Sequence, residues 1–242
     1  MRAVFRQPKW IVATLAVVVI AAVFVRLGFW QLDRLDERKT TNAIGQERLA
    51  AEPVRLPDLL AEAGDDLESI EFRRVIVEGT YDPAREVLIR SQVELGQAGF
   101  HVITPLHSDE GWSVLVNRGW VPLPMDTPPV EPTPAPGEVR QEGWVHLTET
   151  RPSLGPEDPP GDVSVFNRVD IGRIGEQVGE VLAPVYVVSL GEGSEVLPVP
   201  VNLPDFANEG PHLAYAIQWF GFALVGLVGF FFLVRNKGVQ GK

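Results

Sequence analysis

The sequence contains no cysteine among its 242 residues. A chain without cysteine forms no disulfide and offers no thiolate, which excludes cysteine-based zinc sites, copper transfer through a CxxC motif and covalent attachment of c-type haem. Common catalytic motifs are missing as well: HExxH, the P-loop, GxSxG and a GxGxxG segment after a strand do not occur. These absences argue against many frequent enzyme classes.

Acidic residues are missing from both ends of the chain. All 32 of them lie between Asp33 and Glu209, where 14 arginines and lysines oppose them, so this middle segment carries a net charge of −18. The formal net charge of the whole chain, −11, conceals this division. A segment so acidic repels a phosphate backbone, which argues against nucleic-acid binding.

Two long apolar runs, residues 10–32 and 212–234, occupy the acid-free ends, and Arg26 is the only charged residue in either. As helices they span roughly 33 Å, enough for a hydrocarbon core of about 30 Å, so both are predicted to be transmembrane helices. A cleaved signal peptide is the alternative for the first run. No small-x-small cleavage site precedes the charged DRLDERK, which favours a retained signal anchor.

Basic residues flank the two apolar runs on their outer sides, three in residues 1–9 and three in residues 235–242. Because cytoplasmic flanks are enriched in lysine and arginine, both ends are predicted to be cytoplasmic tails. Residues 10–32 and 212–234 then form the two spans of a bacterial-type cell-membrane protein. Residues 33–211 form one exoplasmic domain.

The middle segment has an α+β pattern. After a polar helical stretch that continues the first membrane helix outward, short strand-like runs alternate with Gly and Pro turns. We expect these runs to form an antiparallel sheet that curls or closes into a barrel, with a short helix begun by Asp170 before the last strand. The predicted strands are residues 72–81, 85–92, 98–106, 111–123, 142–150 and 183–190.

Polar groups of the middle segment each allow two interpretations. His101 and His107 lie six residues apart and suit a metal only weakly without a third ligand, so hydrogen-bonded or surface histidines are favoured. Two Pro-rich stretches are either ligands for a proline-binding partner or exposed loops, and loops are favoured. The NRGW segment is either a docking corner or a structural corner with a paired arginine and a core tryptophan. Its residues are Asn117, Arg118, Gly119 and Trp120.

The segment GPHLAYAIQWF opens the second apolar run with polar residues that an anchor does not need. His212, Tyr215 and Trp219 fall at i, i+3 and i+7, on one face of a helix. An aromatic belt at the membrane interface is one interpretation. A haem site is the other, since a neutral imidazole beside flat aromatic rings suits an iron porphyrin. Gln218 lies inside the run and requires a partner, because an unsatisfied amide is costly in lipid.

These residues resemble the surfeit-locus-type (Surf) assembly factors for cytochrome c oxidase. The first helix of that family ends in a G-x-W-Q-x-x-R-x-x-x-K pattern. Gly28, Trp30, Gln31 and Arg34 match it here, while Arg38 stands at the lysine position. The segments EGTYDPAREVLIRSQ, GFHVITPL, NRGWVP and HLAYAIQWFGFA are similar to further blocks of the family. The similarity extends from about residue 26 to residue 234.

The resemblance implies a protein that is not an enzyme but a membrane-anchored factor assisting haem a insertion into, or stabilisation of, oxidase subunit I. His212 corresponds to the proposed haem ligand of bacterial members, with Tyr215 and Trp219 as apolar contacts for the ring or its farnesyl tail. Arg26 would meet a haem propionate or a lipid phosphate. The implied partners are subunit I, the haem a biosynthesis or assembly machinery and the lipid bilayer. The alternative is a scaffold or accessory subunit of the oxidase, or of its supercomplex, that never ligates haem.

Overall fold

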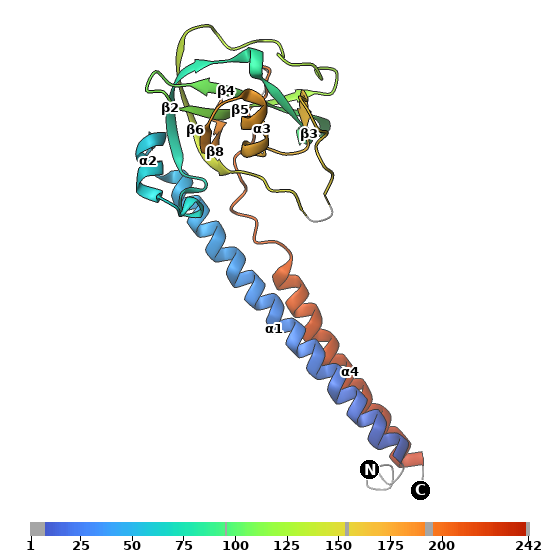
Figure 1. Cartoon of the computed structure of the whole chain (residues 1–242). Helices are drawn as coiled ribbons and strands as arrows, with labels where there is room; N and C mark the ends of the chain where they lie inside the picture. Colours follow the sequence, from blue (N-terminus) through green and yellow to red (C-terminus); the bar gives the residue numbers. More distant parts are fainter. Residues whose placement is uncertain (1–7, 95, 153–154, 192–195, 241–242) are drawn as a thin grey trace. The chain divides into compact units, whose positions relative to one another are not determined.

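The computed structural model describes residues 8–94, 96–152, 155–191 and 196–240, with side chains up to Lys237. The chain divides into two compact units. The helical unit comprises the chain up to Ile44 together with the part from Asp205 onward, and the barrel unit comprises Gly45–Pro204. Figure 1 shows that the helical unit contains two long helices and the barrel unit contains the strands.

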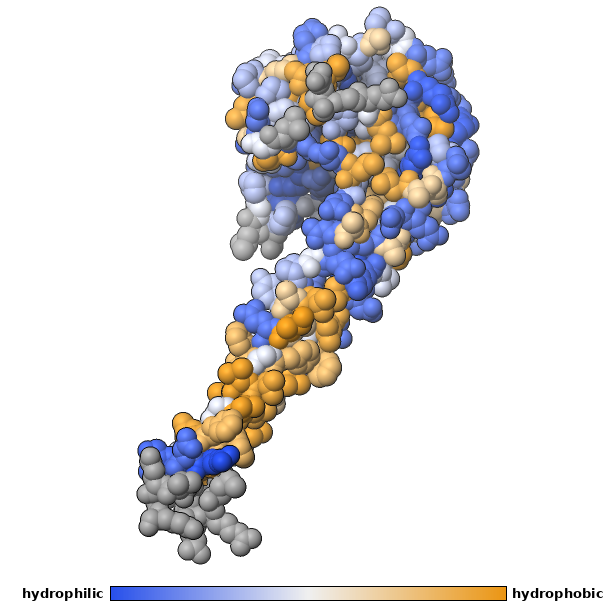
Figure 2. Space-filling view, turned by 180° about the vertical axis from the view of Figure 1, so that it is seen from behind, coloured by the Kyte–Doolittle hydropathy of each residue, from blue (hydrophilic) through white to orange (hydrophobic). Residues whose placement is uncertain are grey.

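Helix α1 extends from Pro8 to Ala50 and helix α4 from His212 to Gln240 (Figure 1). Both are long and apolar enough to cross a membrane. Figure 2 shows hydrophobic side chains covering most of the helical unit. The two apolar runs therefore lie in helices, as a two-span membrane protein requires. Helix α1 also continues through the polar DRLDERK stretch, as the sequence predicted.

The two helices pack along a narrow seam. Several buried positions of α1 recur every seven residues, a repeat that keeps one stripe of a helix facing its partner. This stripe contains Ala21, Gly28, Leu35 and Asn42, with the buried Gln31 beside it, and the buried residues of α4 are Ala216, Ala223 and Val234. The approach is close at Gly28, where a Cβ atom would lie 2.6 Å from the ring of Phe220. The absence of a side chain at Gly28 lets the ring of Phe220 approach α1 closely.

The strands of the barrel unit form one sheet. Within the described residues they are β1 (Val54–Arg55), β2 (Arg74–Tyr81), β3 (Val87–Glu94), β4 (Gln97–His107), β5 (Ser113–Pro122), β6 (Glu138–Leu147), β7 (Val165–Phe166) and β8 (Leu182–Ser189). Their order is β1-β2-β6-β8-β5-β4-β3-β7, and a β2–β4 pairing closes a five-stranded ring. Apolar side chains such as Val77, Leu106 and Val187 form the core. The predicted α+β fold with a barrel-like sheet is confirmed.

Short helices accompany the barrel. Helix α2 spans Leu56–Ala63, helix α3 spans Ile171–Val178, and single 3₁₀ turns lie at Leu67–Ile70 and Pro83–Arg85. The predicted start of α3 is correct: the carboxylate of Asp170 accepts a hydrogen bond from the backbone amide of Arg173 at 3.0 Å, which caps the helix.

The sheet departs from a purely antiparallel order at three pairs. The pairs β1–β2, β3–β7 and β5–β8 are parallel. Strand β8 lies between β6, to which it is antiparallel, and β5, to which it is parallel. Strands β1 and β7 have two residues each and α2 has eight, too few for hydrophobic periodicity to reveal them.

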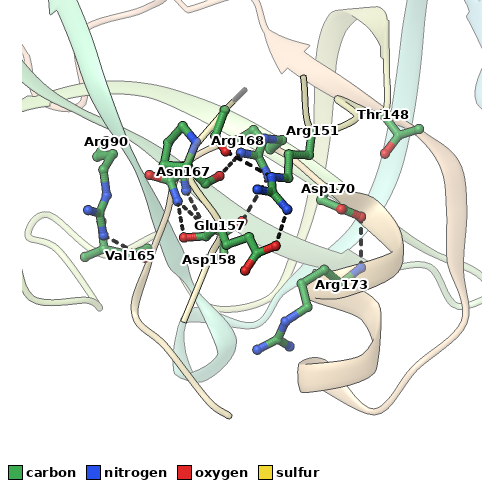
Figure 3. Close-up of polar contacts among 12 residues, drawn as sticks. Arg90, Thr148, Arg151, Glu157, Asp158, Val165, Asn167, Arg168, Asp170 and Arg173 are labelled. Atoms are coloured by element: carbon green, nitrogen blue, oxygen red, sulfur yellow. Dashed lines mark hydrogen bonds and ion pairs between the residues drawn. The ribbon is translucent and has the colours of Figure 1, made fainter. Parts of the chain in front are cut away.

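A polar cluster holds the second Pro-rich segment against β7, and Figure 3 shows its members. Asp158 accepts a hydrogen bond from the side chain of Asn167 at 2.7 Å and forms a buried ion pair with Arg168 at 3.3 Å. Arg151 pairs with Glu157 at the exposed side of the cluster. The described residues of this segment therefore form an anchored loop.

Candidate functional site

His212 is the first residue of α4, and its ring faces α1. The Nδ1 atom lies 2.9 Å from the side-chain oxygen Oε1 of Gln31. Gln31 is buried on the α1 seam, with 9% of its surface exposed, and His212 is half-buried. The structure thus joins the predicted haem ligand to a residue of the first-helix pattern, although the two are 181 positions apart.

A short segment ahead of α4, Asn208–Gly210, is tied to the same face of α1; we call it the clasp. Asn42 donates a hydrogen bond from Nδ2 to the carbonyl oxygen of Asn208 at 3.1 Å, and Lys39 lies 3.5 Å from Glu209. Within the clasp, the amide of Gly210 donates to Oδ1 of Asn208 at 2.9 Å. These contacts fix the start of α4 without involving the ring of His212.

The clasp was not foreseen from the sequence. Asn42 follows Gln31 by eleven residues, about three helical turns, so the sequence does indicate that both side chains lie on one face of α1. Nothing in the spacing indicated that Asn208 would meet it, because the pairing is set by how α1 and α4 pack.

The second ring nitrogen of His212, Nε2, lies beside the clasp glycine. Gly210 has a φ of +72°, and a Cβ atom there would lie 3.5 Å from Nε2 and 3.4 Å from the adjoining ring carbon. Nε2 makes no hydrogen bond within the part of the chain that the structure describes. An imidazole nitrogen without a protein partner, beside space that a larger side chain would occupy, fits one axial bond to a haem iron.

Aromatic rings follow His212 along the helix pair. Trp219 is half-buried, and its ring centroid lies 5.4 Å from that of Phe24 and 5.9 Å from that of Phe222. Tyr215 is 46% exposed. Further along α4 is an apolar groove of about 230 Å³ between the two helices. Its lining residues are Val17, Ile20, Ala21, Phe24, Phe222, Ala223 and Gly226.

Three predicted residues of α1 lie off the seam. Arg26 is exposed and precedes Gln31 by five residues, which places it roughly 140° away around the helix. The structure therefore does not bring Arg26 to the imidazole of His212. Trp30 is 44% exposed, and the guanidinium of Arg34 lies 6.0 Å from its ring centroid, a cation–π distance.

Gln218 lies on an exposed face of α4. Within the described residues its side-chain amide has no hydrogen-bond partner. The partner that the sequence requires for Gln218 therefore does not come from the described part of this chain.

Two glycines of α4 have open space around them. A Cβ atom at Gly221 or Gly229 would meet nothing within 4 Å, so these glycines are not needed for packing against α1.

The NRGW segment forms a β-bulge in β5. The pairing register with β4 shifts here and leaves Arg118 without a residue opposite. Gly119 has a φ of +133°, and a Cβ atom there would lie 2.4 Å from the carbonyl oxygen of Val199, so the position requires glycine. Asn117 accepts the amide hydrogen of Gly119 through Oδ1 at 3.0 Å, and Trp120 is buried.

Arg118 reaches a buried carboxylate that the sequence analysis did not single out. Its guanidinium donates to Glu86 at 2.9 Å, and the Glu86 side chain has no exposed surface. The same carboxylate accepts hydrogen bonds from the hydroxyl of Thr104 at 2.7 Å and the backbone amide of Val130 at 2.8 Å. Arg118 also donates to the carbonyl oxygen of Pro132 at 2.9 Å. These contacts support the structural interpretation of the corner, and they tie the first Pro-rich segment to the barrel.

The two candidate metal histidines of β4 have separate partners. His101 Nδ1 lies 3.2 Å from the side-chain amide of Asn117, and burial lowers the pKa of His101 to about 4. His107 Nδ1 lies 2.9 Å from the hydroxyl of Ser113, and its Nε2 lies 3.6 Å from Asp82. Among the described residues no group of three or more His, Asp or Glu side chains is arranged to hold a metal ion.

Two long apolar helices, one before and one after a closed five-stranded barrel in the chain, with a histidine at the start of the second helix, define a class of two-helix barrel proteins. The chain belongs to the SURF1 family, which matches residues 18–224. The resemblance drawn from the GFWQ, NRGW and HLAYAIQWF segments is thereby confirmed.

Relatives span nearly the whole chain. An uncharacterized SURF1-like protein of Mycobacterium tuberculosis is 30% identical over 229 residues, which cover 92% of this chain and 82% of the relative. A SURF1-like protein of Rickettsia felis is 25% identical over 230 residues, covering 92% and 96%. Surfeit locus protein 1 of Arabidopsis thaliana is 35% identical over 127 residues, covering 48% and 35%.

Proposed function

We propose that this SURF1-family chain is a membrane-anchored assembly factor for cytochrome c oxidase. It assists insertion of haem a into subunit I, or its stabilisation there, by binding and passing on the haem rather than by catalysing a reaction. The observation that carries the proposal is the imidazole of His212, whose Nε2 lies beside Gly210 and has no hydrogen-bond partner among the described residues.

The residues around His212 suit a carrier. Haem a supplies an iron that accepts an imidazole nitrogen, and cargo held through one protein ligand is released by breaking one bond. Trp219 and Phe24 present flat apolar surfaces near the ligand, and the groove beyond them is lined by apolar side chains. In this proposal the groove receives the farnesyl tail, which removes that tail from water.

The proposed orientation places both termini in the cytoplasm and the barrel unit on the exoplasmic side of a bacterial-type cell membrane. The charge distribution supports this orientation. The two tails, residues 1–9 and 235–242, carry only basic charges, and the segment between the two apolar runs carries a net charge of −18. The proposed partners are oxidase subunit I and the machinery that makes or delivers haem a. The barrel faces the compartment in which it would meet exoplasmic surfaces of the oxidase.

Absorption spectroscopy tests the proposal. The protein is purified in mild detergent from cells that make haem a, as wild type, His212→Ala and His146→Ala. His146 is a half-exposed histidine of the barrel and serves as the matched control. We expect bound haem in the wild type and in His146→Ala and its loss in His212→Ala. Wild-type protein without bound haem in every preparation would contradict the proposal.

A scaffold that contacts oxidase intermediates without ligating haem is the second candidate. Gln218 favours it, because an amide in an apolar span without an intramolecular partner is best satisfied by a helix of another protein. Co-purification of oxidase subunits separates the two candidates. A scaffold predicts that Gln218→Leu weakens co-purification while His212→Ala changes neither co-purification nor oxidase haem content. A carrier predicts that His212→Ala lowers the oxidase haem content.

A further inference from the structure

The contact between Gln31 and His212 determines which ring nitrogen is free. The amide oxygen Oε1 of Gln31 is an acceptor only, so the Nδ1 atom of His212 at 2.9 Å must donate the hydrogen. In a neutral imidazole one nitrogen carries the hydrogen and the other carries the lone pair. In the neutral form of His212 this contact places the lone pair on Nε2, the nitrogen beside Gly210.

Packing of the two helices does not by itself require an amide side chain at position 31. Gln31 lies on the seam with Gly28 and Leu35 and is 9% exposed, so an aliphatic side chain of similar length suits the same surroundings. A buried amide is costly unless hydrogen-bonded, and the described residues provide His212 as its partner. The amide is thus matched to the imidazole rather than to the helix pairing.

The backbone of His212 is held by other contacts. The clasp hydrogen bond from Asn42 to Asn208 and the ion pair of Lys39 with Glu209 fix the chain just before α4. The Gly28–Phe220 contact fixes α4 further along. Removal of the Gln31 amide therefore frees the ring of His212 while the helix remains anchored on both sides of it.

We propose that Gln31 is the positioning residue of the His212 site: it holds the ring hydrogen on Nδ1, sets the ring orientation, and so presents Nε2 as the ligating nitrogen. The inference rests on the proposed function of His212 as a metal ligand. Metal-bound histidines commonly donate their other ring hydrogen to a nearby oxygen, which fixes the tautomer and raises the basicity of the ligating nitrogen. Gln31 provides that oxygen before any haem is bound.

Nitrogen-15 NMR of the full chain in detergent tests the tautomer without haem. Protein labelled at the histidine ring nitrogens is compared as wild type, Gln31→Leu, Gln31→Glu and Asn42→Leu, with His212→Ala identifying the His212 signals. Asn42→Leu is the matched control, because it removes an interhelical hydrogen bond from the same face of α1 without touching the imidazole. We expect the Nδ1–H form in the wild type, in Asn42→Leu and in Gln31→Glu, whose carboxylate also accepts. Gln31→Leu should shift the ring toward the Nε2–H form.

Haem titration supplies the second readout, with ferric haem b as the probe. Gln31→Leu should raise the dissociation constant about tenfold to a hundredfold. Asn42→Leu should change it far less, because the Lys39–Glu209 ion pair and the Gly28–Phe220 contact still hold α4. Gln31→Glu should bind as the wild type does and shift the reduction potential of the bound haem to a more negative value, because a more basic ligand favours ferric iron. A wild-type ring in the Nε2–H form, or an unchanged tautomer in Gln31→Leu, overturns the inference. Absence of haem binding in every variant overturns the proposed function, and the tautomer measurement then still decides the role of Gln31.

Discussion

Arg118 donates to Glu86 at 2.9 Å inside the barrel unit, and the carboxylate it meets has no exposed surface. Both oxygens of this carboxylate accept hydrogen bonds, since Oε2 accepts from Arg118 and Thr104 and Oε1 accepts from the amide of Val130. Breaking a buried ion pair by removing one partner leaves an uncompensated charge, whereas replacing both partners by apolar residues does not.

Substitution of one member of this pair should destabilise the barrel more than substitution of both. Arg118→Met is expected to lower the free energy of unfolding by about 3–5 kcal/mol, because the Glu86 carboxylate stays buried without its cation. The double variant Arg118→Met, Glu86→Leu should regain a large part of that loss. Urea unfolding followed by tryptophan fluorescence measures each value. A double variant as unstable as the sum of the two single variants would contradict the pairing.

Alanine should destabilise the barrel more at Gly119 than at another glycine that has a positive φ but open space around it. Gly111 is the control: its φ is +85°, and a Cβ atom there meets nothing within 4 Å. Gly111→Ala should lower the free energy of unfolding by about 1 kcal/mol through backbone strain alone. Gly119→Ala adds a clash with the carbonyl oxygen of Val199 at 2.4 Å. We expect a loss of more than about 2 kcal/mol for Gly119→Ala in the same unfolding assay. Equal losses would show that the bulge tolerates a side chain.

The stability of the barrel should fall as the pH drops from about 6.5 toward 4. Burial lowers the pKa of His101 to about 4 from its usual 6.5, so in that window the unfolded chain binds a proton that the folded chain does not. The contribution of His101 is complete above about pH 6.5 and is lost on acidification, by on the order of 3 kcal/mol in total. His101→Gln removes the titrating group and should flatten the pH dependence of the unfolding free energy over this window. A variant with the wild-type slope would assign the effect to other groups.

A larger side chain in the groove of the helical unit should weaken the binding of haems that carry a long tail and leave the binding of haems without one unchanged. Gly226 lines the groove and has open space at its Cβ position, so Gly226→Leu occupies the groove without a clash. Gly229 also has open space but does not line the groove, which makes Gly229→Leu the matched control. We expect Gly226→Leu to weaken binding of haem a about tenfold and to leave haem b binding unchanged, in spectroscopic titrations of the full chain. Equal effects on both haems would place the tail elsewhere.

Much of the architecture followed from patterns that the sequence displays directly. The apolar runs, the six longer strands and the Asp170 cap are local signals, because each depends on residues within one helix or strand. The parallel β5–β8 pair and the ring closure between β2 and β4 depend on contacts between distant segments, for which one sequence holds no local signal.

The candidate site likewise has residues that the sequence singled out and contacts that it did not predict. His212 and Gln31 were both singled out, one as a candidate haem ligand and one as part of a family pattern, but their contact was not predicted. Glu86 was missed because nothing around it in the chain distinguishes it from the many acidic residues of an acidic domain. Its importance arises from burial, which only the fold creates.

The ring of Phe220 fits into the gap above Gly28, and this notch has a consequence for the membrane. We expect a contact this close to resist sliding of one helix along the other. A thinner or thicker bilayer would then be met by tilting of the pair as one body. The contact of His212 with Gln31 would keep its register when the lipid composition changes.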